Sequence, residues 1–289
     1  MKRVATTLTL ILIAAACSAE TSQEPTAAPA VTTSIATTTL APPTPPPPTT
    51  TTTLSPFARP DWLGTRILPL RPDENGEVQP TPLELQDRTF ETIDLFPPPS
   101  TDDFLWTLGP VPPDVLARSS WTAECPVEVD ELAYLTVSHY GFDGRFHTGE
   151  IMVNATVAED VLSVFRRLHS ARFPIEQMRV IRLDEVDDPP TGDWNETTSF
   201  VCRPAVGSSG WSQHAFGLAV DINPFHNPYQ KADLVIPELA SVYTDRGDVR
   251  VGMILSDDVV TAAFADIGFA WGGNWNTLKD WMHFSQSGS

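Results

Sequence analysis

The most informative stretch of the chain is Ser209–Pro224, which reads Ser-Gly-Trp-Ser-Gln-His-Ala-Phe-Gly-Leu-Ala-Val-Asp-Ile-Asn-Pro. A second stretch, Lys279–Phe284, reads Lys-Asp-Trp-Met-His-Phe. Together they supply two histidines and two acids: His214, Asp221, Asp280 and His283. Two neutral imidazoles, one carboxylate and an open position form a catalytic zinc site, whereas structural zinc sites are closed and often cysteine-rich. The acid beside the second histidine, Asp280, would then be the general base for a metal-activated water.

Spacing alone does not separate metal ligation from a structural role for these residues. Leu218-Ala219-Val220 is typical of a strand, which places His214 on the entering turn and Asp221 toward the strand's far end. On a regular final strand, Asp280 and His283 would point to opposite faces.

The joint pattern, Ser212-x-His214-x-x-Gly217-x-Ala219-x-Asp221 followed by Asp280-x-x-His283, resembles the zinc D-alanyl-D-alanine carboxypeptidase family. Three flanking segments are similar too: Asn223-Pro224, Asn227-Pro228-Tyr229 and Gly268-Phe269-x-Trp271-Gly272-Gly273. The resemblance spans Gly149 to Ser285. That family shares its fold with lysostaphin-type peptidases and the hedgehog signalling domain.

The resemblance implies an α+β fold, with a mainly antiparallel sheet, flanking helices and a zinc site on the sheet. It implies Zn²⁺ held by His214, Asp221 and His283, with Asp280 as the base; the alternative for Asp280 is an acid with a structural role only. It also implies a local irregularity in the last strand. Relatives that cleave D-Ala-D-Ala carry glutamate at the position of Asp280, and the aspartate resembles the L-alanyl-D-glutamate endopeptidase branch. The bond that is cleaved therefore stays open.

Two further residues have alternative roles. Arg203 would bind a substrate carboxylate or stabilise an oxyanion, or else form a structural salt bridge. Ser212 would hydrogen-bond substrate or hold the turn before His214. The tryptophans near the motifs are expected mainly in the core, and His226 is expected on an exposed loop.

The expected function is that of an exported zinc metallopeptidase hydrolysing peptidoglycan stem peptides, of the D-Ala-D-Ala carboxypeptidase or L-Ala-D-Glu endopeptidase type. The first alternative is a zinc-containing, non-catalytic hedgehog-like module that binds the cell wall. The second is a cell-wall anchoring protein that binds no metal.

Residues 1–17 have the pattern of an export signal. Lys2 and Arg3 precede the apolar run Val4–Ala16, which is too short to span a membrane as a helix. The run ends Ala14-Ala15-Ala16-Cys17-Ser18, which resembles a bacterial lipobox with Cys17 as the lipidated residue. The alternative is ordinary signal-peptidase cleavage nearby. Lipidation would hold the protein at the outer face of the cytoplasmic membrane, within the cell wall.

Composition divides the rest of the chain. Residues 18–56 form a Thr/Pro-rich linker with too few apolar residues to offset the entropy of folding. Residues 57–113 are expected to form an irregular extension that wraps over the next domain, with further linker as the alternative. Residues 114–289 form the zinc peptidase domain, expected as a monomer. Lys+Arg is 18 against Asp+Glu 37, a net charge of −19. A nucleic-acid binder needs clustered basic residues, so that class is excluded.

Cys125 and Cys202 remain once Cys17 is assigned to the lipid anchor. An even pair in an oxidising compartment predicts a disulfide. Two buried free thiols are the alternative.

The pattern of apolar residues predicts α+β without regular βαβ alternation. Strands are expected over Leu132–Ser138, Gly149–Asn154, Met178–Leu183, Ser199–Arg203, Gly217–Ile222 and Asp280–Ser285. Helices are expected from Val157 to Leu168, and from an N-cap at Ser256 to an end at Gly268.

Overall fold

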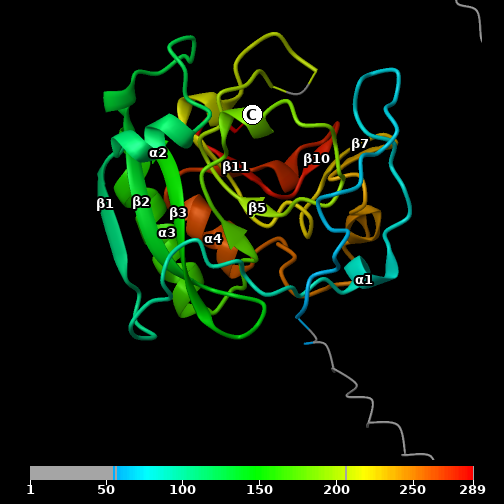
Figure 1. The fold of residues 1–289 in the computed structure, drawn as a ribbon, viewed down its shortest axis with the longest axis horizontal. Coiled ribbons are helices and arrows are strands. Elements are labelled where there is room, and N and C mark those ends of the chain that lie inside the picture. Colours follow the sequence, from blue (N-terminus) through cyan, green and yellow to red (C-terminus); the bar gives the residue numbers. More distant parts are fainter. Residues whose placement is uncertain (1–54, 56, 206, 289) are drawn as a thin grey trace, which may run out of the picture. The chain divides into compact units, whose positions relative to one another are not determined.

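A computed structural model describes residues 55, 57–205 and 207–288 and confirms an α+β fold with small sheets and short helices (Figure 1). Three sheets are antiparallel, and β4 (Gln177–Met178) pairs in parallel with β5 (Glu196–Thr197). The signal-like segment, Cys17 and nearly all of the linker lie outside the described residues. None of the helices among the described residues has the length and the hydrophobicity of a membrane span.

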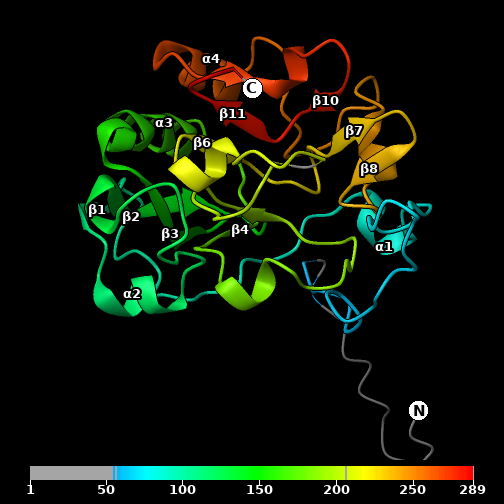
Figure 2. The same cartoon turned by 90° about the horizontal axis from the view of Figure 1, so that it is seen from above.

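The first sheet has the order β1-β2-β3, with β1 at Trp106–Pro110, β2 at Leu132–Tyr140 and β3 at Phe146–Asn154. β2 and β3 confirm two predicted strands. The helix α3 (Ala158–Ser170) confirms the helical spacing and buries Val161, Leu162, Val164, Phe165 and Leu168. α3 contacts β2 on one side and α4 (Val259–Asp266) on the other (Figure 2). This packing forms the main core of the domain.

Two more antiparallel sheets carry the motif residues. One has the order β6-β11-β9, from Ala219–Asp221, His283–Ser285 and Ala270–Trp271. The other has the order β10-β7-β8, from Lys279–Asp280, Tyr229–Lys231 and Leu234–Ile236. The single strand predicted over Asp280–Ser285 is therefore wrong: the chain changes sheets at Trp281 and Met282. This change is an irregularity of the kind that the resemblance implied.

Other boundaries differ from prediction as well, and the strand expected over Gly217–Ile222 is limited to β6. The strand expected over Met178–Leu183 is limited to β4. The segment Ser199–Arg203 contains no strand, and its backbone forms single hydrogen bonds to other segments, such as the one from Phe200 N to Met152 O at 3.0 Å. α4 is capped by Asp258, whose side chain accepts from the Val260 and Thr261 amides, and not by Ser256. Gly268 follows the helix with φ +81°, as expected of a C-terminal glycine.

The extension over residues 57–113 includes α1 (Leu83–Gln86) and β1, and α2 (Pro113–Arg118) begins at its end. Its side chains enter a second apolar cluster, in which Leu68, Leu85 and Phe90 pack with Phe225 and Tyr243. The extension thus shares a core with segments that follow the first motif. Short 3₁₀ turns lie at Val129–Glu131, Ala155–Val157, Leu183–Glu185, Gln213–Phe216, Ser241–Thr244 and Gly272–Asn274.

Candidate metal centre

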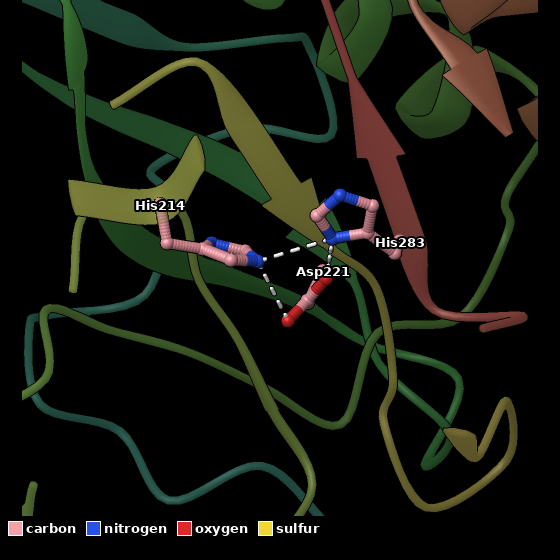
Figure 3. A group of neighbouring side chains, drawn as sticks. All are labelled: His214, Asp221 and His283. Carbon is pink, nitrogen blue, oxygen red and sulfur yellow. Dashed lines mark hydrogen bonds and ion pairs between the residues drawn. The ribbon is translucent and has the colours of Figure 1, made fainter. Parts of the chain in front are cut away.

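Three side chains from the two motifs meet in a buried cluster (Figure 3). His214 Nε2 lies 3.1 Å from Asp221 Oδ2 and 3.2 Å from His283 Nδ1. His283 Nδ1 lies 3.1 Å from Asp221 Oδ1. The structure therefore brings together the three residues predicted as metal ligands.

Local backbone geometry explains how His214 reaches the cluster. It lies in the 3₁₀ turn Gln213–Phe216, whose N-cap Ser212 accepts a hydrogen bond from His214 N through Oγ at 3.3 Å. Gly217 ends the turn with φ +67°, and a Cβ there would lie 2.5 Å from Asn154 N. Glycine is needed both for the left-handed conformation and for this close approach to β3. The turn then leads directly into β6.

Asp221 and His283 are held together by strand pairing. They are opposite partners in the β6–β11 register, so their side chains project from the same face of the sheet. The strand pairing thus brings together two residues that are 62 positions apart in sequence.

The hydrogen bonding of His214 leaves a lone pair pointing into the cluster. Its Nδ1 lies 2.6 Å from Ser199 O, and because a carbonyl can only accept, Nδ1 carries the proton. In the neutral ring Nε2 is then an acceptor that faces a carboxylate and a second imidazole. Metal-binding histidines are commonly oriented by such a hydrogen bond from their other nitrogen.

The donor set fits a divalent cation such as Zn²⁺. One ligand atom from each residue lies within 4.8 Å of the other two, and the two imidazole nitrogens are 3.2 Å apart, close to the ligand–ligand edge of about 3.3 Å expected for tetrahedral coordination at 2.0–2.1 Å. Burial alone would raise the pKa of Asp221, but the charges of His214 and His283 and their hydrogen bonds hold it below its usual range. The carboxyl group is thus in the ionised state that a metal requires.

Asp280 lies beside this cluster on the neighbouring sheet. Its Oδ1 is shielded from solvent and has no hydrogen-bond partner among the described residues. Loss of hydration, with the nearby charge of Asp221, raises the pKa of Asp280 to about 7, against the opposing charges of His283 and Arg203. A carboxyl group with a pKa near 7 can both accept and donate a proton at neutral pH.

Arg203 and Ser212 have different surroundings. Arg203 donates from Nη1 to Pro204 O at 3.1 Å, and no ion pair to it is recorded in the described part of the chain. The structural salt bridge, one of the two alternatives for Arg203, is therefore not formed with the described residues, and the positive charge of Arg203 opposes the rise in the pKa of Asp280 that burial causes. Ser212 is buried and caps the turn of His214, which is the second of its two expected roles.

A surface cavity of about 660 Å³ lies beside the first motif. Its lining includes Arg203, Trp211 and Cys202, with the carboxylates of Glu74 and Glu124. Trp211 is 42% exposed, whereas Trp271 and Trp281 are buried as expected. The extension thus contributes one residue, Glu74, to the lining of this cavity.

The predicted disulfide between Cys125 and Cys202 is present, with an S–S distance of 2.07 Å. Cys202 follows Val201, whose amide donates to His214 O at 3.2 Å. The bridge therefore anchors the segment on which the first histidine ligand rests.

Comparison with known proteins gives one match. The family model described as D-alanyl-D-alanine carboxypeptidase matches residues 206–286, which confirms the resemblance to the zinc D-alanyl-D-alanine carboxypeptidase family over that segment. The segment holds all three residues of the cluster together with Asp280. No curated protein and no solved structure gave a match. The family match supports a peptidase.

Sequence reasoning missed two supporting groups of the site. The Ser199 carbonyl that orients His214 has no sequence signal, since every residue carries a carbonyl. Gly272 allows Asp280 its position, because a Cβ on Gly272 would lie 2.6 Å from Asp280 O and 2.9 Å from Asp280 Cβ. Here the paired glycines Gly272-Gly273 were a usable signal.

Proposed function

We propose that this protein is an exported zinc metallopeptidase that hydrolyses peptidoglycan stem peptides. The observation that carries the proposal is the convergence of His214, Asp221 and His283 beside a carboxyl group, Asp280, whose pKa is near neutral. The family match over the same segment supports it. The substrate bond is D-Ala-D-Ala or L-Ala-D-Glu, and the cavity beside Trp211 would hold part of the stem peptide.

In the proposed reaction, His214, Asp221 and His283 would hold the zinc ion. When bound, zinc supplies Lewis acidity toward a carbonyl and lowers the pKa of water. Asp280 accepts a proton from the attacking water as the new C–O bond forms. It then delivers that proton to the amine nitrogen as the C–N bond breaks, which returns the carboxylate to its starting state.

The test combines digestion of muropeptides with measurement of metal content. The parent protein should bind about one zinc per chain, and mass spectrometry of the products should identify the cleaved bond. Asp280→Asn should keep zinc but lose about 10²–10⁴-fold in turnover, the usual contribution of a general base. His283→Ala should lose zinc and activity together.

Asp257→Asn is the matched control, because Asp257 is exposed and its φ of +63° suits asparagine as well. It should behave as the parent. An Asp280→Asn variant with parental turnover would remove Asp280 as the base. A parent that binds zinc but cleaves no muropeptide would favour the hedgehog-like binding module, and a parent that binds no metal would favour a cell-wall anchoring protein.

A further inference from the structure

A tyrosine that the proposed reaction does not use stands next to Asp280. Tyr229 and Asp280 are opposite partners in the antiparallel pairing of β7 with β10. Residues that are directly opposite project from the same face, with Cβ atoms about 4.5–5.5 Å apart. The Tyr229 side chain therefore emerges on the face that carries Asp280, while Gln230 and Lys279 emerge on the other.

Asp280, on that face, lies close enough to the metal cluster for the charges of the cluster to act on it. The charge on Asp280 is influenced by His283 and Asp221, which are both members of the cluster. The position of the strand is also fixed, because Gly272 packs on Asp280 and the Trp281 amide donates to Pro228 O at 3.4 Å. The backbone at Tyr229 is thus held in place relative to Asp280 by these contacts.

The hydroxyl group of Tyr229 has no hydrogen-bond partner among the described residues, and the residue is half-buried. Tyr134, by contrast, donates to Glu150, and Tyr243 accepts from the Arg88 amide. Partial burial and the nearby charge of Asp280 raise the pKa of Tyr229, so its hydroxyl keeps its proton at neutral pH.

We propose that Tyr229 is a catalytic residue that donates a hydrogen bond from its phenol to the carbonyl oxygen of the scissile bond. When water adds, the π electrons of the carbonyl move to that oxygen, and the proton of water moves to Asp280. The phenol keeps its proton and stabilises the oxygen's negative charge, a contribution that grows as the charge develops. When the C–N bond breaks, the carbonyl re-forms and Asp280 protonates the leaving amine.

This assignment rests on the proposed peptidase function. A donor that acts mainly on the tetrahedral species affects turnover more than ground-state binding. Tyr229→Phe removes only the hydroxyl and keeps the aromatic ring. We expect kcat to fall by about 10²-fold, as for loss of one oxyanion donor, with KM, zinc content and melting temperature close to those of the parent.

Tyr140→Phe is the matched control. Tyr140 ends β2, its ring packs against Phe146 at 5.3 Å between centroids, and its hydroxyl likewise has no recorded hydrogen bond in the described residues. The substitution removes the same atom from a different sheet and should leave kcat unchanged.

A second measurement does not depend on turnover. A phosphinate analogue of the cleaved dipeptide presents a tetrahedral centre with a charged oxygen, and its affinity for the zinc-loaded protein can be measured by calorimetry. Tyr229→Phe should weaken this affinity by about 10-fold or more, in line with loss of a charge-assisted hydrogen bond. Tyr140→Phe should bind the phosphinate as the parent does.

The outcomes separate this assignment from the proposed function. If the parent cleaves stem peptides while Tyr229→Phe matches it in kcat and phosphinate affinity, the role of Tyr229 is overturned and the peptidase stands. If Tyr229→Phe loses zinc along with activity, the tyrosine supports the metal centre and the donor role is wrong. If the parent cleaves no peptide, the proposed function fails and this assignment falls with it.

Discussion

A buried ion pair joins the extension to the rest of the domain, and its loss should destabilise the protein strongly. Arg88 lies in the extension, with Nε 2.7 Å from Glu176 Oε2 and Nη2 2.8 Å from Oε1. Both side chains are at most 2% exposed. Arg88 also donates to Asp193 O at 2.5 Å. Replacing Arg88 by methionine keeps much of the volume but leaves the carboxylate of Glu176 buried with weaker compensation.

Removing one partner of a buried pair costs about 3–5 kcal/mol, because the remaining charge is desolvated. Arg59 and Asn195 still contact Glu176 at 3.0 and 2.7 Å, so we expect the lower end of that range for Arg88→Met. With a urea slope of about 2 kcal/mol per molar, the unfolding midpoint should fall by about 1.5 M.

Arg71→Met is the matched control. Arg71 lies in the same extension and pairs with Asp233, which is 81% exposed. Exposed ion pairs contribute little to the free energy of unfolding, so the urea midpoint of Arg71→Met should equal that of the parent. The double variant Arg88→Met with Glu176→Met should recover part of the lost stability, because it leaves no buried carboxylate, although Arg59 loses its ion pair with Glu176. An Arg88→Met midpoint equal to that of Arg71→Met would refute the reasoning.

Three other outcomes are expected. Burial lowers the pKa of His226 to about 4, so its contribution to the free energy of unfolding should be complete above about pH 6.5 and decrease as the pH falls toward 4, by up to about 1.4 kcal/mol per pH unit. The urea midpoint should decrease less between pH 7 and 4.5 in His226→Gln than in the parent, and an identical decrease would contradict this. The bond between Cys125 and Cys202 closes a long loop, so its reduction should cost about 2–4 kcal/mol, and thiol counting in denatured, unreduced protein should find neither cysteine free. Cys17→Ser should release the protein from the membrane fraction; a native protein that is already soluble and begins beyond Cys17 would exclude lipidation.

The sequence predicted which three side chains meet in the candidate metal centre, because ligand chemistry restricts residue type. Only a few side chains can bind zinc, and the two motifs contain them at fixed spacing. The helices and the long strands were also predictable, since α3 repeats its apolar residues at helical spacing and β2 is rich in β-branched and aromatic residues. These properties depend on neighbours along the chain.

The missed features depend on partners far away in sequence. His226 was expected on an exposed loop but is fully buried: its Nε2 donates to Arg88 O at 2.9 Å, and its Nδ1 accepts from Asn195 Nδ2 at 3.1 Å. Both partners belong to segments that no local pattern connects with His226. Burial of a polar side chain is tolerated once its hydrogen bonds are satisfied. Hydrophilicity alone therefore misplaced this residue.

The break between β10 and β11 has a consequence for the chemistry of the site. Asp280 pairs with Tyr229 in one sheet, whereas His283 pairs with Asp221 in another. The buried residues Trp281 and Met282 connect them, and the Trp271 indole donates to Trp281 O at 2.8 Å, which fixes the crossing. Asp280 thus belongs to one hydrogen-bonded sheet, whereas Asp221 and His283 belong to another. In a single regular strand, Asp280 and His283 would project from opposite faces, and the change of sheet between them lets the acid lie beside the cluster while β6 and β11 keep their pairing.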